Sequence, residues 1–465
     1  MDNSAPRPSQ SARPPQPPRG LRHLLGLPDL TGNGRFLAAN VIDSLGNGLV
    51  LAFTVVYFTR TTDLPLVEIG AALTLGHLLS LPVPALVGPL LDRIGPRAVV
   101  AVGNLVSAGG FLGFLFCRQA WMIVLFQLVV QTGSNIYWTS SRPLVVLAAR
   151  EGERQRWFAL TSSLRNIGAG FGAAVAALLL QFAGTTGLRA VVVANTATFL
   201  LAAWLISSWR PTGEQPRPTG AAAPADRPAG SYRDVLRDLP YLRLVAANLG
   251  FVLAAMVLPV LLAVYATGTL HAAAWIVGAL VVLNTGLVAL AQTTVARWGE
   301  HRNPVRVLAL AAVLNAVAFG LFGALLAVPG WAVEAGLVLA VLVYTLAEMV
   351  GGPPSNELSV AMAKEHIQGR YQAAFQLSWT IGGAVSPVVL TALLGRGPLW
   401  PWVFLAAFSL LSVLLVQGLG GRPAKSAEPA EPVASAGPAA SADPTATATA
   451  PAPAASASAE VSGAA

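Results

Sequence analysis

One acidic residue near the start of the sequence lies inside a long apolar run, where a charge is costly and is seldom kept without a use. Asp43 shares a helical face with Asn40 and Asn47, at spacings of three and four. We expect this polar face to border a wet cavity. A carboxyl group there could bind and release a proton, so Asp43 is a candidate for proton coupling. The alternative is a carboxylate held by a neighbouring arginine for structure alone.

A second acidic residue, Glu348, lies in the middle of another apolar run. Tyr344 lies one helical turn before it, and Gly351 to Pro354 follow, where a helix is expected to kink. A carboxyl group beside such a kink could act as a proton switch or bind a cationic substrate. A structural hydrogen bond is the alternative.

Polar residues also recur along single faces of three apolar runs. The run 120–148 places five of them at steps of four, four, three and four: Gln127, Gln131, Asn135, Trp138 and Arg142. Two later runs repeat the pattern, with Phe158, Ser162, Arg165 and Gly172 in one and Gln372, Gln376, Trp379 and Gly383 in the other. Such faces predict a polar pathway. Arg142 could instead extend towards the membrane surface, and Arg165 needs a partner, for which Asp43 is the obvious candidate.

Aromatic residues in these runs have two interpretations. Trp138, Trp379, Tyr344 and Tyr265 could form walls for an amphipathic or cationic ligand, or they could fill packing gaps. His77 is expected to be a packed, neutral imidazole. Cys117 is the only cysteine, so no disulfide and no cysteine-based metal site is expected.

The elements that carry these residues are long apolar segments. Hydrophobic residues make up 54% of the chain, charged residues 11%, and the mean hydropathy is +0.62. About 20 apolar residues span a bilayer as a helix. The twelve candidate runs cover residues 35–59, 66–91, 98–117, 120–148, 157–183, 188–209, 242–267, 272–296, 304–328, 331–361, 370–394 and 399–419. We therefore predict an all-α membrane protein with twelve transmembrane helices.

The basic residues predict the orientation of these helices. Connections on one side hold most of them, including Arg93, Arg97, Arg150, Arg154, Arg156, Arg297, Arg302, Arg306, Lys364 and Arg370. The positive-inside rule makes that side cytoplasmic, with both termini inside and the protein in the inner (cell) membrane. Because the net charge of +8 is spread over short loops, nucleic-acid binding is not expected.

Composition divides the chain into five parts. Residues 35–209 and 242–420 are expected to form two six-helix bundles, joined by a cytoplasmic linker at 210–241. Residues 1–34 and 421–465 are expected to be disordered cytoplasmic tails, because they are rich in Pro, Ala and Ser.

An internal repeat makes the two bundles pseudo-symmetric. The stretch from Arg156 to Gly168 matches the stretch from Arg370 to Gly382, and both open an apolar run on the predicted cytoplasmic side. Arg93-Ile94-Gly95 is matched in the same way by Arg297-Trp298-Gly299. Equivalent positions in two halves favour duplication.

The best sequence motif lies between the second and third runs, where the chain reads Gly-Pro-Leu-Leu-Asp-Arg-Ile-Gly-Pro-Arg over residues 88–97. It resembles the signature loop of the major facilitator superfamily, and the resemblance extends over residues 35 to 420. The resemblance implies a conformational gate formed by Gly88, Asp92, Arg93, Gly95 and Arg97. Physically, Gly88 permits close helix approach, Gly95 a tight turn, and Asp92 an ion pair that must break when the halves rock.

Within that superfamily the chain resembles the proton-coupled drug and multidrug exporters, on the basis of Glu348 and of Gly369-Arg370-Tyr371. Two features depart from them. Gln127 stands where such exporters often carry an arginine, and the fifth run has Gly168, Gly170 and Gly172 instead of a Gly-Pro motif.

The resemblance implies a secondary active transporter, and we expect proton-coupled efflux of a small amphipathic molecule by alternating access. A proton-coupled symporter for a small metabolite is the alternative; a membrane scaffold or a membrane-embedded enzyme is a further one. No phosphate-binding Gly-rich loop with a lysine is present, so the proton gradient is the expected energy source. We expect no enzymatic activity, cofactor or metal, and a monomer whose partners are its substrate and the lipid bilayer.

Overall fold

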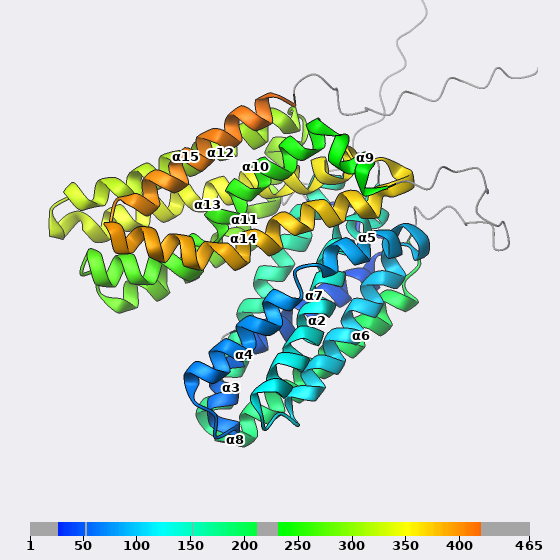
Figure 1. Ribbon diagram of the computed structural model, residues 1–465. Helices are drawn as coiled ribbons and strands as arrows, with labels where there is room; N and C mark the ends of the chain where they lie inside the picture. The colour runs from blue at the N-terminus through cyan, green and yellow to red at the C-terminus, as the bar shows by residue number, and fades with distance from the viewer. Residues whose placement is uncertain (1–26, 52–53, 151, 212–230, 420–465) are drawn as a thin grey trace, which may run out of the picture. The chain divides into compact units, whose positions relative to one another are not determined.

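The computed structural model describes residues 27–51, 54–150, 152–211 and 231–419, and all regular secondary structure within them is helical (Figure 1). Helices are expected here because an apolar chain in lipid must satisfy its backbone N–H and C=O groups internally.

The first half of the chain forms seven of these helices. They are α2 (Gly34–Leu51), α3 (Thr54–Thr61), α4 (Leu66–Leu79), α5 (Val83–Ile94), α6 (Pro96–Phe114), α7 (Ala120–Ala148) and α8 (Arg154–Ser208). The axes of α4 and α5 differ by 43°, so together they form one bent span. The bend falls at Ser80 to Pro82, where Pro82 precedes the first residue of α5.

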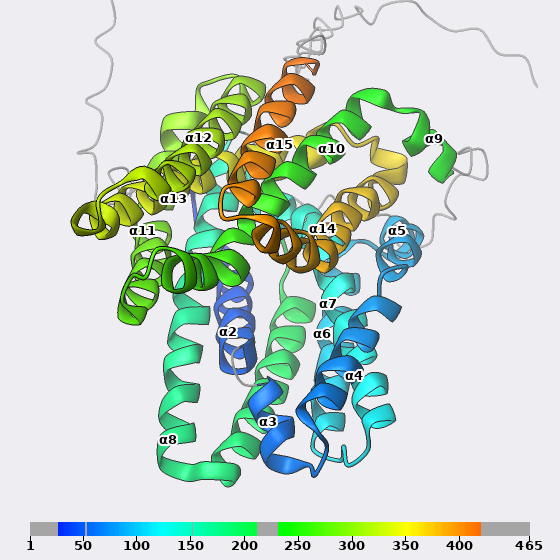
Figure 2. The same cartoon turned by 60° about the vertical axis from the view of Figure 1, so that its left-hand side comes forward.

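Helix α8 supplies two spans. Figure 2 shows it running down one side, turning at its lower end and returning. α8 and α2 make the most extensive contact between any two helices of the structure. Glycines allow this close approach: a Cβ at Gly48 would collide with the backbone of Ala169, and one at Gly172 with the carbonyl of Leu45.

The second half begins with the short helix α9 (Tyr232–Arg237) and α10 (Leu239–Ala255), which continues through the π-helical turns η1 (Val257–Leu262) and η2 (Tyr265–Thr269). Its other long helices are α11 (Ala274–Glu300), α12 (Pro304–Ala324), α13 (Gly330–Ala361), α14 (Gln368–Arg396) and α15 (Trp400–Gln417). Two 3₁₀ turns, η3 (Leu325–Ala327) and η4 (Glu365–Ile367), lie between them. α13 continues through Pro353 and Pro354 without a break in its assigned range.

The number of spans agrees with the predicted fold. Among the described residues, eight helices are long and apolar enough to cross a membrane, and ten if each bent pair counts as one span. α7 and the first leg of α8 complete the twelve; in α7 the polar residues lower the mean hydropathy. The predicted all-α, twelve-helix, two-bundle architecture is confirmed.

The predicted domain boundaries differ from the structure in two places. Residues 27–33, expected in a disordered tail, make contacts: Asn33 donates from Nδ2 to the Ala148 carbonyl at 3.1 Å and accepts from Trp209 Nε1 at 3.2 Å. The expected linker 210–241 contains α9 and the start of α10. The amino-terminal residues 1–26, the linker residues 212–230 and the tail 420–465 lie outside the described residues.

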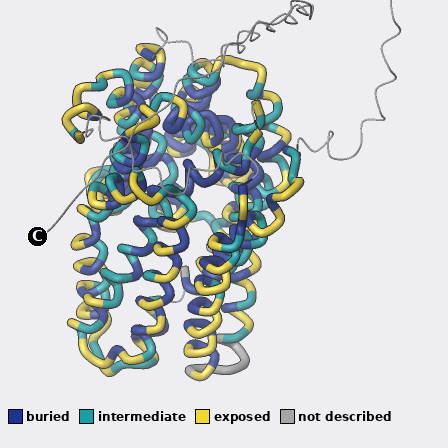
Figure 3. The backbone as a smooth tube through the Cα atoms, turned by 90° about the vertical axis from the view of Figure 1, so that its right-hand side faces the viewer, coloured by how far each residue is buried: buried dark blue, intermediate teal, exposed yellow. Residues whose placement is uncertain are grey.

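Burial has the pattern of a helical bundle in lipid. Figure 3 shows buried positions on the inner faces of the helices and exposed positions on the outer ones. Many exposed side chains are large and apolar, such as Leu86, Val282 and Leu290. In water such a surface would aggregate, whereas in lipid it costs nothing. The chain is a multi-pass membrane protein.

Candidate functional site

The motif at 88–97 joins the two halves. Asp92 Oδ1 accepts a hydrogen bond from the backbone N–H of Gly369 at 2.5 Å, and its Oδ2 accepts one from Arg370 Nη1 at 2.7 Å. Gly88 lies against the same turn of α14, where an added Cβ would be 3.0 Å from the Cα of Arg370. The motif therefore fastens α5 of the first half to the start of α14 in the second.

The other motif residues have simpler roles. Gly95 ends α5 with a φ of 82°, a left-handed conformation that favours glycine. Arg97 donates from Nη1 to the carbonyl of Trp209 at 2.9 Å and so ties α6 to the end of α8. Arg93 is exposed.

Further contacts hold the halves together at this end, which we call the basic end because it carries the arginine-rich loops. Arg156 and Glu300 form an ion pair at 2.5 Å between Nη2 and Oε2. Gln155 donates from Nε2 to Glu357 Oε2 at 2.7 Å. With the Asp92 contacts, they close the basic end.

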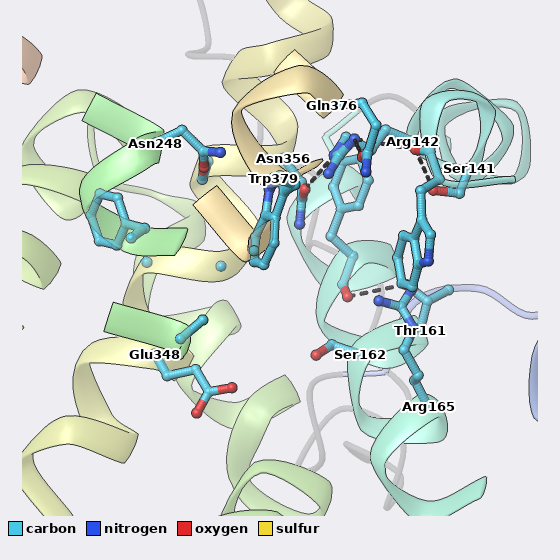
Figure 4. Close-up of a pocket in the computed structure, with 18 of the residues that line it drawn as sticks. Ser141, Arg142, Thr161, Ser162, Arg165, Asn248, Glu348, Asn356, Gln376 and Trp379 are labelled. Atoms are coloured by element: carbon cyan, nitrogen blue, oxygen red, sulfur yellow. Dashed lines mark hydrogen bonds between the residues drawn. The ribbon is translucent and has the colours of Figure 1, made fainter. Parts of the chain in front are cut away.

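A central cavity of about 520 Å³ lies between the halves (Figure 4). Both halves line it, and nine of the predicted site residues do so: Gln131, Asn135, Trp138, Arg142, Arg165, Tyr344, Glu348, Gln376 and Trp379. The cavity has the size of a ligand pocket, for which about 300–1,000 Å³ is usual.

Arg142 bridges the halves at the wall of this cavity. It donates from Nε to Asn356 Oδ1 at 2.8 Å and from Nη1 to Gln376 Oε1 at 3.2 Å, and its guanidinium carbon lies 4.6 Å from the ring centroid of Phe375. The side chain is buried, so it does not extend to the membrane surface. The structure thus places Arg142 at the wall of the central cavity, and its role there stays a prediction.

Glu348 and Arg165 face the cavity from opposite walls, as Figure 4 shows. Glu348 Oε2 accepts a hydrogen bond from Asn284 Nδ2 at 2.9 Å, and the same amide lies 3.0 Å from Thr345 Oγ1. The guanidinium carbon of Arg165 lies 4.3 Å from the ring centroid of Trp138, a cation–π contact.

Asp43, whose face was expected to border a wet cavity, does not line the central one. It lines a second cavity of about 350 Å³, which we call the lateral chamber, together with Asn47 and Gln127. Asn40 is buried but lines neither cavity. The reason is geometric: α2 packs mainly against α8, whereas the first-half lining of the central cavity comes from α4, α7 and α8. Among the described residues no ion pair or hydrogen bond joins Arg165 to Asp43, and the guanidinium of Arg165 acts on this carboxylate through its charge alone.

For other single residues the structure decides between the interpretations that the sequence left open. Tyr265 is fully buried in the apolar core of the second half and donates to the carbonyl of Phe322, so it forms no cavity wall. Gln372 is buried against Ser359. His77, expected to be a packed and neutral imidazole, is half-buried, and it also lines the central cavity.

Several cavity residues were not singled out from the sequence. Four amides come from the second half: Asn248, Gln292, Asn315 and Asn356. Each is an amide within an otherwise apolar run, which is the signal that could have found it. No group of His, Cys, Asp or Glu that could hold a metal is found among the described residues.

Comparisons with known proteins agree with this architecture. The family model described as Major Facilitator Superfamily matches residues 36–387. Multidrug resistance protein MdtH of Klebsiella pneumoniae (strain 342) is 23% identical over 391 residues, which cover 81% of this chain and 91% of that protein.

Solved structures show the same fold. A bacterial homologue of the iron transporter ferroportin, in an outward-facing state, aligns with a TM-score of 0.67 and 16% identity, covering 84% of this chain and 100% of that one. The proton:xylose symporter XylE aligns with a TM-score of 0.65 and 15% identity, covering 83% and 94%.

Proposed function

The chain belongs to the major facilitator superfamily and is a secondary transporter; on that premise we propose that it exports a small amphipathic molecule in exchange for protons. The export proposal is supported by the relatives named multidrug resistance proteins, of which the chain covers about nine tenths. Neither an enzymatic activity nor a cofactor is part of the proposal, and a monomer suffices, since one chain encloses the cavity.

The observation that carries the proposal is the central cavity with a carboxyl group on one wall. Glu348 accepts a hydrogen bond from Asn284, and no cation of the described residues forms an ion pair with its carboxylate. A carboxyl group so placed gains stability either by binding a proton or by meeting a cationic substrate. Competition between the two is the simplest form of exchange, because each would expel the other.

Sidedness follows from the loops. We propose that the basic end is cytoplasmic and that both termini lie on that side of the cell membrane. The contacts of Asp92, Gln155 and Arg156 then make the closed end the cytoplasmic one, so this conformation would be outward-facing. The structural neighbour in an outward-facing state supports this assignment.

Symport is the second candidate. Amides and hydroxyls from both halves line the cavity, which suits a polar metabolite, and one structural neighbour is a proton:xylose symporter. The two candidates differ in the direction of substrate movement. A symporter carries its substrate in the same direction as the inward flow of protons, whereas a proton-coupled exporter carries its substrate in the opposite direction.

Proteoliposomes with an imposed pH gradient test the proposal. A fluorescent lipophilic cation should accumulate on the side from which protons leave, and dissipating the gradient should abolish accumulation. Glu348→Gln should reduce the gradient-driven rate at least about tenfold, since the residue can no longer exchange a proton. The Asp43→Asn change is measured beside it, to find which acid couples.

Glu334→Gln is the matched control, because Glu334 is an exposed acid on the same helix, α13. It should leave the rate unchanged. Accumulation that ignores the pH gradient, or that survives the double change Asp43→Asn and Glu348→Gln, would refute proton coupling.

A further inference from the structure

The lateral chamber lies within the first half alone. Its lining comes from α2, α3, α4, α6, α7 and α8, and it includes Asp43, Leu73, Phe111, Tyr137, Trp138 and Phe199. Because no residue of the second half takes part, rocking of the two halves would leave the chamber intact.

One side of the chamber is an aromatic wall. Phe111 and Phe199 stack with centroids 5.6 Å apart and planes 12° apart, and Phe114 meets Phe111 edge-on at 5.3 Å. Flat rings pack well against such a wall by stacked and edge contacts. The volume of about 350 Å³ is within the range of small-ligand pockets.

The lining of the chamber also presents an unsatisfied acceptor. Asp43 is 5% exposed, and its Oδ1 accepts no hydrogen bond from the described residues, while Oδ2 accepts one from Asn47 at 3.3 Å. A buried carboxylate oxygen without a donor is costly, so a donor from outside the chain would be favoured there. Two other polar groups act on this carboxylate: Arg165 through its charge, and the nearby Tyr137 hydroxyl, which lines the same chamber and is the donor that an incoming group would have to join or displace. Since the Arg165 charge already opposes that of Asp43, a neutral donor suits the site better than a second cation.

A thin wall separates the chamber from the central cavity. The same three α7 residues, Gln131, Ser134 and Trp138, line both. The Trp138 indole is held by Arg165 at 4.3 Å on its face and by the Tyr137 ring at 5.3 Å. A group that moved from the centre into the chamber would pass this side chain.

We propose that the lateral chamber is a second binding subsite, which takes an aromatic ring carrying a neutral O–H or N–H donor, with the donor directed at Asp43 Oδ1 and the ring against Phe111 and Phe199. The subsite deepens the proposed function, on which it rests for its role in transport: it would hold the aromatic end of a substrate whose remainder lies in the central cavity. Trp138 is the side chain that divides the two.

Binding to the purified full-length protein tests this without any transport. The probes are 2-naphthol and 2-methoxynaphthalene, which share the ring system and differ in the donor. Equilibrium dialysis against protein-free micelles of the same detergent corrects for partitioning. We expect 2-naphthol to bind at least about tenfold more tightly than 2-methoxynaphthalene, the effect of one hydrogen bond to a charged group.

Two tryptophan variants locate the site. Leu73→Trp fills the chamber from α4 and should weaken 2-naphthol binding at least about tenfold. Leu75→Trp, at a 47% exposed position of the same helix, should not change it. Size-exclusion profiles check that both variants fold, and the comparison of the two probes needs no variant.

Three results would each overturn the subsite: no saturable binding of 2-naphthol, equal affinity for the two probes, or 2-naphthol binding that a folded Leu73→Trp protein retains. If binding behaves as expected but a pH gradient drives no transport, the proposed function fails and the subsite stands.

Discussion

At the scale of single residues, Asp92 has the most defined contacts of the predicted gate. Its carboxylate is mostly buried and accepts from both the Gly369 N–H and the Arg370 guanidinium. Hydrogen bonds to a charged group contribute about 1.5–3 kcal/mol, so removing the charge should cost the closed basic end about 2 kcal/mol. That corresponds to about a 30-fold change in the closed-to-open ratio.

Hydrogen exchange measures this prediction. In Asp92→Asn the amide of Gly369 and its neighbours in the first turn of α14 should exchange up to about 30-fold faster. Glu365→Gln, an exposed acid three residues before α14, is the control and should leave exchange unchanged. Equal protection of α14 in Asp92→Asn and the unmodified chain would mean that Asp92 does not hold the gate.

Residue spacing predicted the site only along single helices. The stripe of Gln131, Asn135, Trp138 and Arg142 could be predicted because positions three and four apart share a face. Which face meets which depends on packing between helices, so the contact of Arg142 with Asn356 could not be predicted. Tyr265 shows a second limit. From the sequence alone, an aromatic ring in an apolar run is equally consistent with core packing and with ligand binding, and only the structure shows that Tyr265 is packed in the core.

At the scale of elements, α9 is too short to be stable by itself. An isolated helix of six residues does not form in water, so its order depends on capping and docking. Ser231 and Asp234 form a capping box, and Val235 is buried in an apolar cluster of the second half. Tyr232 donates from its hydroxyl to the Ala85 carbonyl of α5.

Helix α9 thus connects the halves at the basic end. Burial raises the pKa of Tyr232 to about 12, so its hydroxyl keeps the donated proton at neutral pH. The contact lies beside Gly88, so opening the basic end would have to break it.

Undocking α9 gives a prediction. Val235→Asp places a carboxylate in an apolar cluster, which costs several kcal/mol, and α9 should detach. Trypsin should then cut after Arg233 and Arg237 at least about tenfold faster, as measured by mass spectrometry of the fragments. Leu236→Asp, at the adjacent position that is 66% exposed, should be cut at the original rate. Equal rates for the two variants would show that docking does not protect α9.

The positions of helices were predicted well where local composition determines them and poorly where contacts between helices determine them. Apolar length placed the twelve spans within several residues. It did not predict the bend at Pro82 within the second span, nor α9 within a stretch rich in Pro and Arg, because a six-residue helix leaves no periodic signal. The ordered residues 27–33 were missed for a similar reason: Asn33 is held by partners about 115 and 176 positions away.

At the scale of the whole molecule, alternating access requires the basic end to open during each cycle. Gln155 of α8 and Glu357 of α13 face each other across the closed end, joined by a hydrogen bond of 2.7 Å. The native cysteine will not interfere with thiol chemistry there, because Cys117 is buried and burial raises the pKa of its thiol to about 11.

The double variant Gln155→Cys, Glu357→Cys, joined by a short reducible bis-thiosulfonate linker, should therefore lose transport by more than about tenfold, and reduction should restore it. In each single variant, treated with the same reagent, the two halves remain unlinked. Its transport rate should therefore fall only by the effect of the missing hydrogen bond, roughly two- to tenfold. The measurement is substrate flux in proteoliposomes before and after reduction. If the linked protein turned over at the rate of the reduced one, the two halves would not need to separate at the basic end, and transport by rocking about the central cavity would have to be abandoned.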